Sequence, residues 1–307
     1  MLHMPSADNS VNGPQPHPLK DVPARVVPPP PRNILLGISS SHSSDIALRA
    51  ASDIASQFDA ALHVRQIVDC DVPRSQGEET LAILKTRVAP FIQQANQQDS
   101  LAVLPFANHF NNSEMGTAVA LLEEARKAEA SLIVLGAHKP NQSARRPLLG
   151  TLTQRVVREG TMPLLIAVNE PHTAYQSAIL AIDFSPVSAA VLHQAETVAP
   201  HAAYHLVYFD QDGSDDARPG SAKAASSQQT RLRNFACQHF SPSAQERVTL
   251  SVTNGKPKHA LPLLHDKIQP DLIVVGTSGR EGLFSVKRGS VPQTLFDDPP
   301  CDILIAR

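Results

Sequence analysis

The residues with the clearest chemical potential lie in one glycine-containing segment, GTSGREGLFSVKRGS, at positions 276–290. Gly276 follows an apolar run that is typical of a buried strand, and open α/β sheets bind ligands where such strands end. Gly279 would let the backbone approach a ligand more closely than a residue with a Cβ. Gly289 and Ser290 would open a helix, whose free N–H groups and positive dipole end suit a phosphate. The spacing is therefore consistent with a phosphate-binding loop.

Three cationic side chains and one acidic side chain accompany these glycines: Arg280, Lys287, Arg288 and Glu281. The excess of positive charge favours a bound anion at this loop. On the glycine spacing alone, however, the segment is equally consistent with an ordinary strand-to-helix crossover, in which Ser290 caps the helix. Both interpretations need a strand before the loop and a helix after it, so the surrounding elements must be identified next.

The chain that carries this loop has 307 residues, enough for two domains that each bury a core. Its formal net charge of −2 gives no indication of a nucleic-acid partner. No apolar run approaches the roughly 20 residues needed to cross a bilayer, and no signal-peptide stretch is found at the N-terminus. Cys70, Cys237 and Cys301 are far apart, which argues against a disulfide framework or a structural zinc site. These features predict a soluble protein of the reducing cytoplasm.

Strand-like and helix-like segments alternate from residue 32 onward, and the whole series occurs twice. Ile38 matches Ile182, an offset of 144 (182 − 38), and the strand ending at Gly136 matches the one ending at Gly276, an offset of 140 (276 − 136). A near-constant offset indicates an internal duplication. Apolar strands that alternate with helices predict a parallel sheet covered on both faces. We therefore expect two tandem, doubly wound α/β domains, each with a five-stranded parallel sheet.

Composition divides the chain into segments of different character. We predict a disordered, Pro-rich tail at 1–31, a first domain at 32–169 and a second domain at 176–307. The tail has too little apolar surface to offset its ordering entropy, and its prolines exclude helix. A polar stretch at about 210–228 is predicted to be a flexible insertion within the second domain.

The second copy resembles a known family. Its pattern Gly-x2-Gly-x9-Gly-Ser after an apolar strand is similar to the ATP-binding signature of the universal stress protein family. AIDFSP places Asp183 after the first strand of this copy, where ATP-binding members have an acid, and NGKP supplies the family's G-x-P through Gly255 and Pro257. The resemblance extends over roughly residues 32–307 and implies adenine nucleotide α-hydrolase-like domains. It further implies that the two fifth strands pair with each other near a pseudo-twofold axis.

Applied to this chain, the resemblance implies that ATP, with or without Mg, is bound in the second domain. Ala181 and Asp183 would flank the nucleoside, although Asp183 is also consistent with a solvated acid at a helix entry. Tyr208 would offer backbone groups to adenine, and Val275 would pack nearby. The residues implied around the phosphates are Gly276, Gly279, Arg280, Gly289, Ser290 and Val291.

The first copy departs from this pattern at each position that matters for nucleotide binding. Ser39 replaces the acid, Lys139 stands where the second glycine is expected, and the spacing to Gly150 is one residue longer. We therefore predict no ATP site in the first domain. Arg145 and Arg146 keep its loop basic, which leaves a different anionic ligand open.

These features together predict a stress-response regulator that holds ATP in its second domain and acts as a sensor or scaffold. Efficient phosphoryl transfer needs a positioned nucleophile and usually a metal-holding carboxylate, and the loop offers no obvious general base. We expect no enzyme beyond slow ATP hydrolysis or self-phosphorylation at Ser285 or Ser290. Two alternatives stay open: an interaction scaffold without nucleotide, and a receptor for another small metabolite in the first domain. The sequence specifies neither a protein partner nor further dimerisation.

Overall fold

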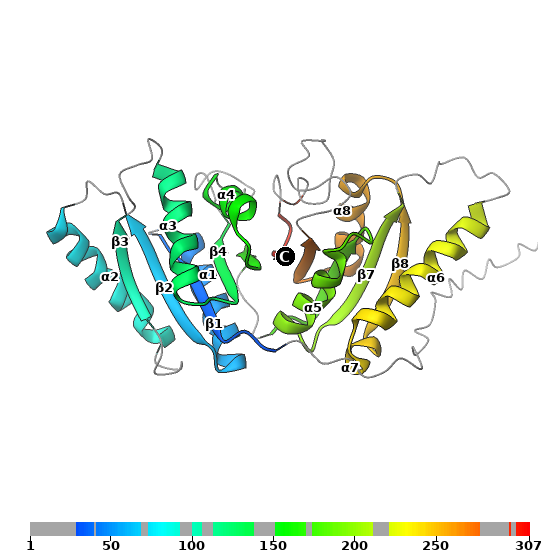
Figure 1. Ribbon diagram of the computed structural model, residues 1–307, viewed down its shortest axis with the longest axis horizontal. Coiled ribbons are helices and arrows are strands. Elements are labelled where there is room, and N and C mark those ends of the chain that lie inside the picture. Colours follow the sequence, from blue (N-terminus) through cyan, green and yellow to red (C-terminus); the bar gives the residue numbers. More distant parts are fainter. Residues whose placement is uncertain are drawn as a thin grey trace, which may run out of the picture.

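The computed structural model describes residues 29–39, 41–68, 73–92, 100–105, 113–137, 151–169, 174–210, 221–276, 295 and 299–307. Ten strands within these ranges form one continuous sheet, in the order β3-β2-β1-β4-β5-β10-β9-β6-β7-β8. Figure 1 shows the two halves of the chain side by side, with the first half in blue to green and the second in green to red. Of the predicted tail, residues Met1 to Pro28 lie outside the described part of the chain.

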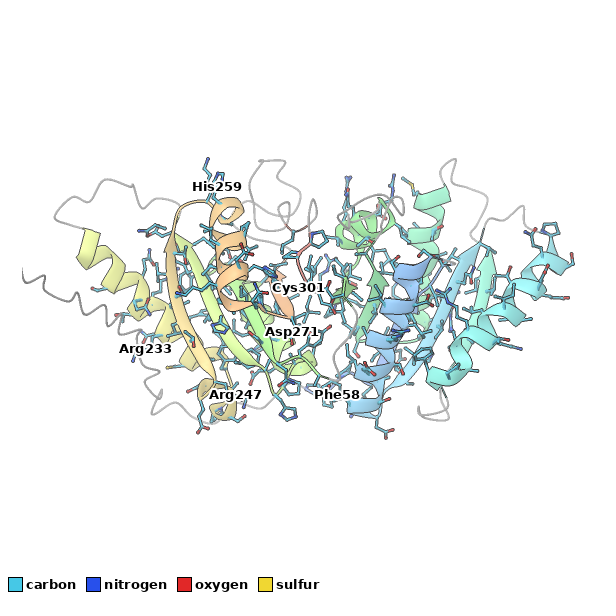
Figure 2. All side chains as sticks on the ribbon, turned by 180° about the vertical axis from the view of Figure 1, so that it is seen from behind. Phe58, Arg233, Arg247, His259, Asp271 and Cys301 are labelled. Atoms are coloured by element: carbon cyan, nitrogen blue, oxygen red, sulfur yellow. The ribbon has the colours of Figure 1, made fainter. Side chains whose placement is uncertain are left out.

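The first half is a parallel sheet in which the order of strands reverses beside β1. Its strands are β1 (Asn33–Gly37), β2 (Ala61–Val68), β3 (Ser100–Pro105), β4 (Leu132–Gly136) and β5 (Leu164–Ala167). Its helices are α1 (His42–Phe58), α2 (Arg74–Ile92), α3 (Ser113–Lys127) and α4 (Thr151–Glu159). Helices α3 and α4 cover the face seen in Figure 1, and α1 and α2 cover the face seen in Figure 2. The doubly wound fold predicted for this half is confirmed.

The second half repeats this arrangement. Its strands are β6 (Ser177–Ile182), β7 (Ala203–Asp210), β8 (Val248–Asn254), β9 (Leu272–Gly276) and β10 (Asp302–Ala306). Its helices are α5 (Ser188–Val198), α6 (Ser221–His239), the single-turn α7 (Pro242–Gln245) and α8 (Pro257–Ile268). The helix expected from Ser290 lies outside the described residues, apart from helical Leu295. No described helix combines the length and apolar character needed to span a bilayer.

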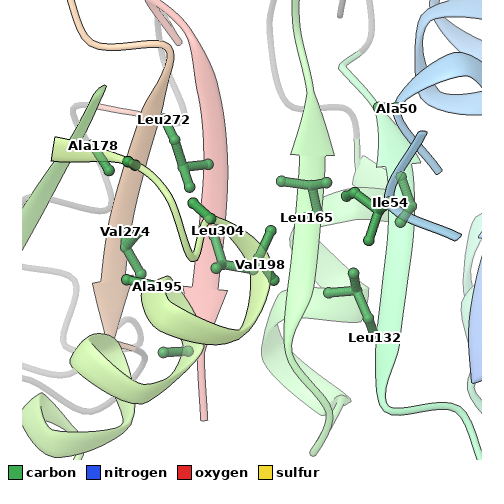
Figure 3. Packing of buried hydrophobic residues seen from close by; sticks show 14 of the residues in the cluster. Ala50, Ile54, Leu132, Leu165, Ala178, Ala195, Val198, Leu272, Val274 and Leu304 are labelled. Carbon is green, nitrogen blue, oxygen red and sulfur yellow. The ribbon is translucent and has the colours of Figure 1, made fainter. Parts of the chain in front are cut away.

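Alternating side chains of the central strands build one core on each face of the sheet. Val274 of β9 and Leu304 of β10 point to the face covered by α5, where Figure 3 shows them near Ala195 and Val198. Ile273, the neighbour of Val274, points to the opposite face. Every residue of β10 is buried. Strands covered on both sides must be apolar at nearly every position, which explains the unbroken aliphatic runs in the sequence.

The two halves join through their fifth strands. β5 and β10 pair in antiparallel register, with Leu165 opposite Leu304 and Ile166 opposite Ile303. The predicted pairing of the fifth strands is therefore confirmed, and it occurs within one chain. The resulting sheet has no exposed edge at the seam, since each half covers the other's fifth strand.

Side chains at both ends of β10 fasten it to the first half. The buried carboxylate of Asp302 accepts hydrogen bonds from the backbone N–H groups of Val168 (2.8 Å) and Asn169 (3.2 Å), and from the hydroxyl of Tyr175 (2.8 Å). At the other end, Arg307 donates to backbone carbonyls in the last turn of α4. In Figure 2, Asp271 and Cys301 lie close to this junction, near the start of β9 and β10.

The predicted insertion at 210–228 is too broad. Asp210 is the last residue of β7, and α6 begins at Ser221. Residues 221–228 read SAKAASSQ, in which alanine, lysine and glutamine are good helix formers. Their polarity suggested a loop, but they form the first turns of α6. Residues 211–220 lie outside the described structure.

Candidate functional site

The carboxyl ends of three parallel strands meet in the second domain. β6 lies between β7 and β9, with Ile182 opposite Tyr208 and Ala181 opposite Val275. All four side chains are buried, those of Ala181 and Val275 in one core and those of Ile182 and Tyr208 in the other. The structure thus brings Ala181, Tyr208 and Val275 together at adjacent strand ends, and it leaves mainly their backbone groups to line a site at this edge.

Asp183 follows β6 directly and organises the turn into α5. Its Oδ1 atom accepts hydrogen bonds from the backbone N–H of Ser185 (3.0 Å) and from the hydroxyl of Ser188 (3.1 Å). The backbone N–H of Asp183 lies 3.4 Å from the same hydroxyl of Ser188. The residue is nevertheless only half-buried. Asp183 therefore fixes the helix entry and still presents part of its carboxylate at the edge where the strands end.

Phe184, which the sequence analysis did not single out, anchors this turn. Its φ of 59° lies in the left-handed region, which is uncommon for a bulky residue. Its ring packs against Tyr208, with centroids 4.8 Å apart, and against Phe235 of α6, with centroids 5.6 Å apart. The guanidinium carbon of Arg231, also on α6, lies 4.0 Å from the centroid of the Phe184 ring. The aromatic cluster and the cation together hold Phe184 in this conformation.

The strand-end glycines of the two domains serve the same packing purpose. A Cβ on Gly276 would collide with Cγ1 of Val187, which precedes α5. A Cβ on Gly136, the equivalent residue of the first domain, would collide with the backbone carbonyl of Ser43 in α1. Both glycines let a helix N-terminus cross closely over a strand end. Gly276 thus has a packing role in the fold, and by itself it does not mark a phosphate site.

The G-x-P segment forms the turn between β8 and α8. Gly255 has a φ of +98°, which favours glycine, and its N–H donates to the carbonyl oxygen of Asp210 (3.0 Å). Pro257 is the first residue of α8, where its missing N–H and fixed φ are suited to a helix start. The segment therefore places the N-terminus of α8 at the same edge of the sheet as Asp183.

The phosphate side of the predicted site stays a prediction. Its implied residues Gly279, Arg280, Gly289, Ser290 and Val291 all lie outside the described residues. The structure describes the nucleoside side, formed by the ends of β6, β7 and β9, and the residue Gly276 from which the loop departs. The polar groups found there are carboxylate and carbonyl oxygens, which accept hydrogen bonds, and backbone N–H groups, which donate them, and both kinds fit the ribose and base of a nucleotide.

The equivalent edge of the first domain is a cavity of about 250 Å³. Its hydroxyl-bearing lining residues are Ser39, Ser41, Ser43, Ser44, Thr117 and Thr153. The hydroxyl of Ser39, which replaces the acid, lies 2.9 Å from that of Ser41 and 3.0 Å from that of Ser44. The Ser44 hydroxyl also accepts from the Ser39 N–H (2.9 Å), much as Ser188 does from Asp183. The loop geometry is thus kept without the carboxylate.

An ion pair lies at the wall of this cavity. Arg65 of β2 contacts the carboxylate of Glu124 on α3 (3.0 Å), and Lys127 contacts the other oxygen of that carboxylate (2.7 Å). Burial would raise the pKa of Glu124, but hydrogen bonds from Lys127 and Arg65 outweigh it and hold the pKa below its usual value. Among the described lining residues, Arg65 is the one lysine or arginine, and Glu124 neutralises it.

Arg87 of α2 secures the loop after β1. Its guanidinium donates to the carboxylate of Asp45 (2.6 Å) and to the backbone carbonyls of Ser39 (2.6 Å) and Ser41 (3.0 Å). Arg231 lies on α6, the corresponding helix of the second domain, and likewise contacts the turn after the first strand of its domain. Because the repeat relates α2 to α6, a cation on each of these helices was the sequence signal that could have identified the two arginines.

Comparison with known proteins agrees with this architecture. A family model described as the universal stress protein family matches residues 31–167 and again residues 174–307. A universal stress protein of Mycolicibacterium smegmatis is 22% identical over 285 residues, covering 89% of this chain and 96% of that relative. Universal stress protein E of Salmonella typhi is 28% identical over 167 residues, covering 54% of this chain and 44% of the relative.

Solved structures show the same fold. The crystal structure of a universal stress protein from Archaeoglobus fulgidus superposes with a TM-score of 0.62 at 14% identity, covering 90% of this chain and 98% of that one. A functionally unknown protein from Pseudomonas aeruginosa superposes with a TM-score of 0.63 at 16% identity, covering 90% and 92%. The family model matches both halves of the chain in succession, and the two halves share one topology. The chain therefore belongs to the universal stress protein family and carries two of its domains in tandem.

Proposed function

We propose that the second domain binds ATP at the carboxyl ends of β6, β7 and β9, and that the protein acts as a stress-response regulator or scaffold. The observation that carries this proposal is the turn after β6. It holds the partly exposed carboxylate of Asp183 beside the strand end at Gly276, from which the glycine-containing segment departs. The acid proposed for the nucleoside thus lies at the strand end from which, in sequence, the segment proposed for the phosphates continues.

The described residues would contribute mainly to the nucleoside side. The Asp183 carboxylate is an acceptor for ribose hydroxyls or for an exocyclic amino group. The backbone at Tyr208 would meet the base edge, and buried Ala181 and Val275 would form the apolar floor. On the phosphate side, the charges of Arg280, Lys287 and Arg288 would offset those of the triphosphate. We assign no catalytic role to these residues, because none of them is a positioned general base.

Thermal unfolding of the full chain with and without millimolar Mg-ATP tests the proposal. A ligand that binds only the folded state stabilises it by RT ln(1 + [L]/Kd), about 2.7 kcal/mol at a hundred times Kd. We expect Mg-ATP to raise the unfolding midpoint of the parent protein. The shift should shrink in Asp183→Asn, which keeps a carbonyl acceptor for Ser185 and Ser188, and in Gly279→Ala.

The repeat supplies a matched control for that experiment. Ser39→Ala changes the equivalent position of the first domain and should leave the ATP-induced shift intact. No shift in the parent protein would contradict ATP binding, provided that mass spectrometry finds no nucleotide carried through purification. Loss of the shift in Ser39→Ala but not in Asp183→Asn would instead assign the effect to the first domain.

A second candidate function rests on the cavity of the first domain. We propose that this cavity of about 250 Å³, lined by serine and threonine hydroxyls, receives a small metabolite other than ATP. Native mass spectrometry of the purified chain tests this directly, because a retained ligand adds a defined mass. Replacing Thr153 at the cavity wall by Val should remove that mass, whereas Asp183→Asn should not.

A further inference from the structure

We infer that Arg231 is a positioning residue of the nucleotide site, which holds Phe184, and through it the carboxylate of Asp183, in the orientation that ATP requires. This inference rests on the proposed function of the second domain. Arg231 lies on α6 and is exposed, whereas Phe184 directly follows Asp183 in the turn. The contact between them joins a peripheral helix to the loop that carries the predicted nucleoside acid.

The conformation of Phe184 sets the geometry of the turn. Phe184, with a φ of 59°, lies between Asp183 and Ser185 in the chain. The Ser185 N–H donates to the Asp183 carboxylate (3.0 Å) across this residue. If Phe184 relaxed to a negative φ, the path of the chain between these two residues would change and this hydrogen bond would be disrupted. A residue with a Cβ disfavours the left-handed region, so contacts of the Phe184 side chain must maintain its positive φ.

The contacts of the Phe184 ring supply that packing. Tyr208 and Phe235 contact it through tilted and edge-on arrangements at 4.8 and 5.6 Å between centroids. Arg231 adds a cation at 4.0 Å from the ring centroid, well within the range of a cation–π interaction. Two of these partners belong to α6, so the position of this helix is coupled to the position of the turn.

The first domain provides an independent reason to assign this role to Arg231. Arg87, on the corresponding helix α2 of the first domain, holds the equivalent loop by hydrogen bonds to the carbonyls of Ser39 and Ser41. It also pairs with Asp45, whereas the equivalent residue of the second domain is Ala189 (189 − 45 = 144). Without a carboxylate at that place, Arg231 acts on the loop through the ring of Phe184. The anchoring arginine is common to both copies and its mode of contact differs.

Affinity measurements on the full chain test the inference. Titration calorimetry with Mg-ATP should show that Arg231→Ala weakens binding roughly three- to tenfold, the scale of a lost cation–π contact. Arg231→Lys should restore binding to within about twofold, because an ammonium group can occupy the same ring face. Arg87→Ala, the matched control, should bind ATP as the parent does. Parent-like affinity of Arg231→Ala would overturn the inference.

A double-mutant cycle distinguishes positioning from direct contact with the nucleotide. If Arg231 acts through Asp183, then Arg231→Ala should cause no further loss in the Asp183→Asn background, since the group that it positions has been altered. Additive losses, together with a failure of Arg231→Lys to restore binding, would overturn positioning in favour of a direct phosphate contact.

A readout without nucleotide separates this inference from the proposed function. Hydrogen exchange at the Ser185 amide reports on the turn itself, and it should be faster in Arg231→Ala than in the parent. If the parent binds no ATP but exchange increases, the proposed function fails while the anchoring of the turn by Arg231 is supported. Unchanged exchange at Ser185 would overturn the anchoring, whatever the affinity for ATP.

Discussion

The sheet edges of the two domains carry the same turn built with different chemistry. After β1 the turn is polar, with linked serine hydroxyls and with Arg87 bound to two backbone carbonyls and to Asp45. After β6 the turn has a carboxylate at Asp183 and an aromatic anchor at Phe184 beneath Arg231. Both turns hold a helix N-terminus against a strand end. The duplication therefore preserved the geometry while the side chains available to a ligand diverged.

This comparison separates residues that the fold requires from residues that a ligand would need. Gly136 and Gly276 are glycine in both copies because each strand end is crossed by a helix N-terminus. Ser39 and Asp183 occupy one place and both bond within the turn that follows, but only Asp183 carries a charge. The fold accepts either residue, so the difference between them is where specific function is to be sought.

The largest expected effect comes from the shared glycines. Gly136→Ala should destabilise the protein by about 3 kcal/mol or more, because the new methyl group meets a backbone carbonyl that cannot turn aside. Gly276→Ala should cost about 1 to 2 kcal/mol, because the Val187 side chain that it meets can change rotamer. Urea unfolding measures both values. Equal costs would show that the two crossings are equally tight and would weaken the comparison.

The next largest effect on stability is expected at the junction of β5 and β10, where the two domains differ. Asp302 at the start of β10 accepts three hydrogen bonds across the junction, whereas the equivalent place at the start of β5 is Pro163 (302 − 163 = 139). Asp302→Ala would leave buried donors unsatisfied and should lower the free energy of unfolding by about 2 to 3 kcal/mol. Urea unfolding monitored in both halves tests this, and a loss confined to the second half would contradict a role at the seam.

The same residue predicts a modest pH dependence. Burial raises the pKa of Asp302 above 3.8, although hydrogen bonds from Val168, Tyr175 and Asn169 oppose the rise. The folded chain therefore keeps this proton to higher pH than the unfolded chain. The contribution of Asp302 to stability should fall as pH rises from about 3.8 through the raised folded-state pKa, and then level off. The difference in unfolding free energy between the parent and Asp302→Asn should follow this course, and a difference that grows with pH would contradict it.

The paired arginines should have smaller effects on stability. Arg87→Ala removes a partly buried ion pair and two hydrogen bonds to carbonyls, and should cost about 1 kcal/mol. Arg231→Ala removes an exposed cation from a ring face and should cost less than 1 kcal/mol. Thermal unfolding ranks the two variants. The opposite ranking would mean that the turn after β6 depends on Arg231 more than the turn after β1 depends on Arg87.

The smallest effect on stability is expected when the turn of the second domain is given the acidic partner that Arg87 has in the first. Ala189→Asp gives the second domain the carboxylate that Asp45 provides in the first, near the N-terminus of α5. We expect a change in stability within about 0.5 kcal/mol, because an exposed ion pair contributes little. Aromatic NMR shifts of Phe184 should nevertheless change as Arg231 moves toward the new acid. Unchanged shifts would show that the two turns differ in more than this one carboxylate.

Most of the fold could be predicted from the sequence, because buried parallel strands must be aliphatic and because the repeat registers each strand against its counterpart. The runs ending at Gly136 and Gly276 are β4 and β9, and the pairing of the fifth strands was expected from the family resemblance. The start of α6 was missed, since composition does not distinguish a polar helix from a polar loop. The single turn of α7 is too short to give a periodic signal.

The candidate site was predictable only in part. Asp183 was identified because it follows a strand and belongs to a family motif, whereas Phe184 was passed over, since a single phenylalanine after a strand has no distinctive spacing. Its left-handed φ and its contact with Arg231, 47 positions away (231 − 184), exist only once α6 is folded against the sheet. The glycines from Gly279 onward and Ser290 stay predictions of the motif alone.

The architecture of two tandem α/β domains follows from the sequence alone, because strand and helix periodicity and an internal offset are local properties that repeat along the chain. The sequence also determined which copy has an acid at the end of its first strand. Tertiary structure decided how each turn is held, since residues in the turns after β1 and β6 meet arginines of α2 and α6 only through helix packing. It decided as well that Gly276 is needed for close packing and that Asp302 joins the halves. Contacts between residues distant in sequence depend on how whole elements dock, and no local pattern encodes that arrangement.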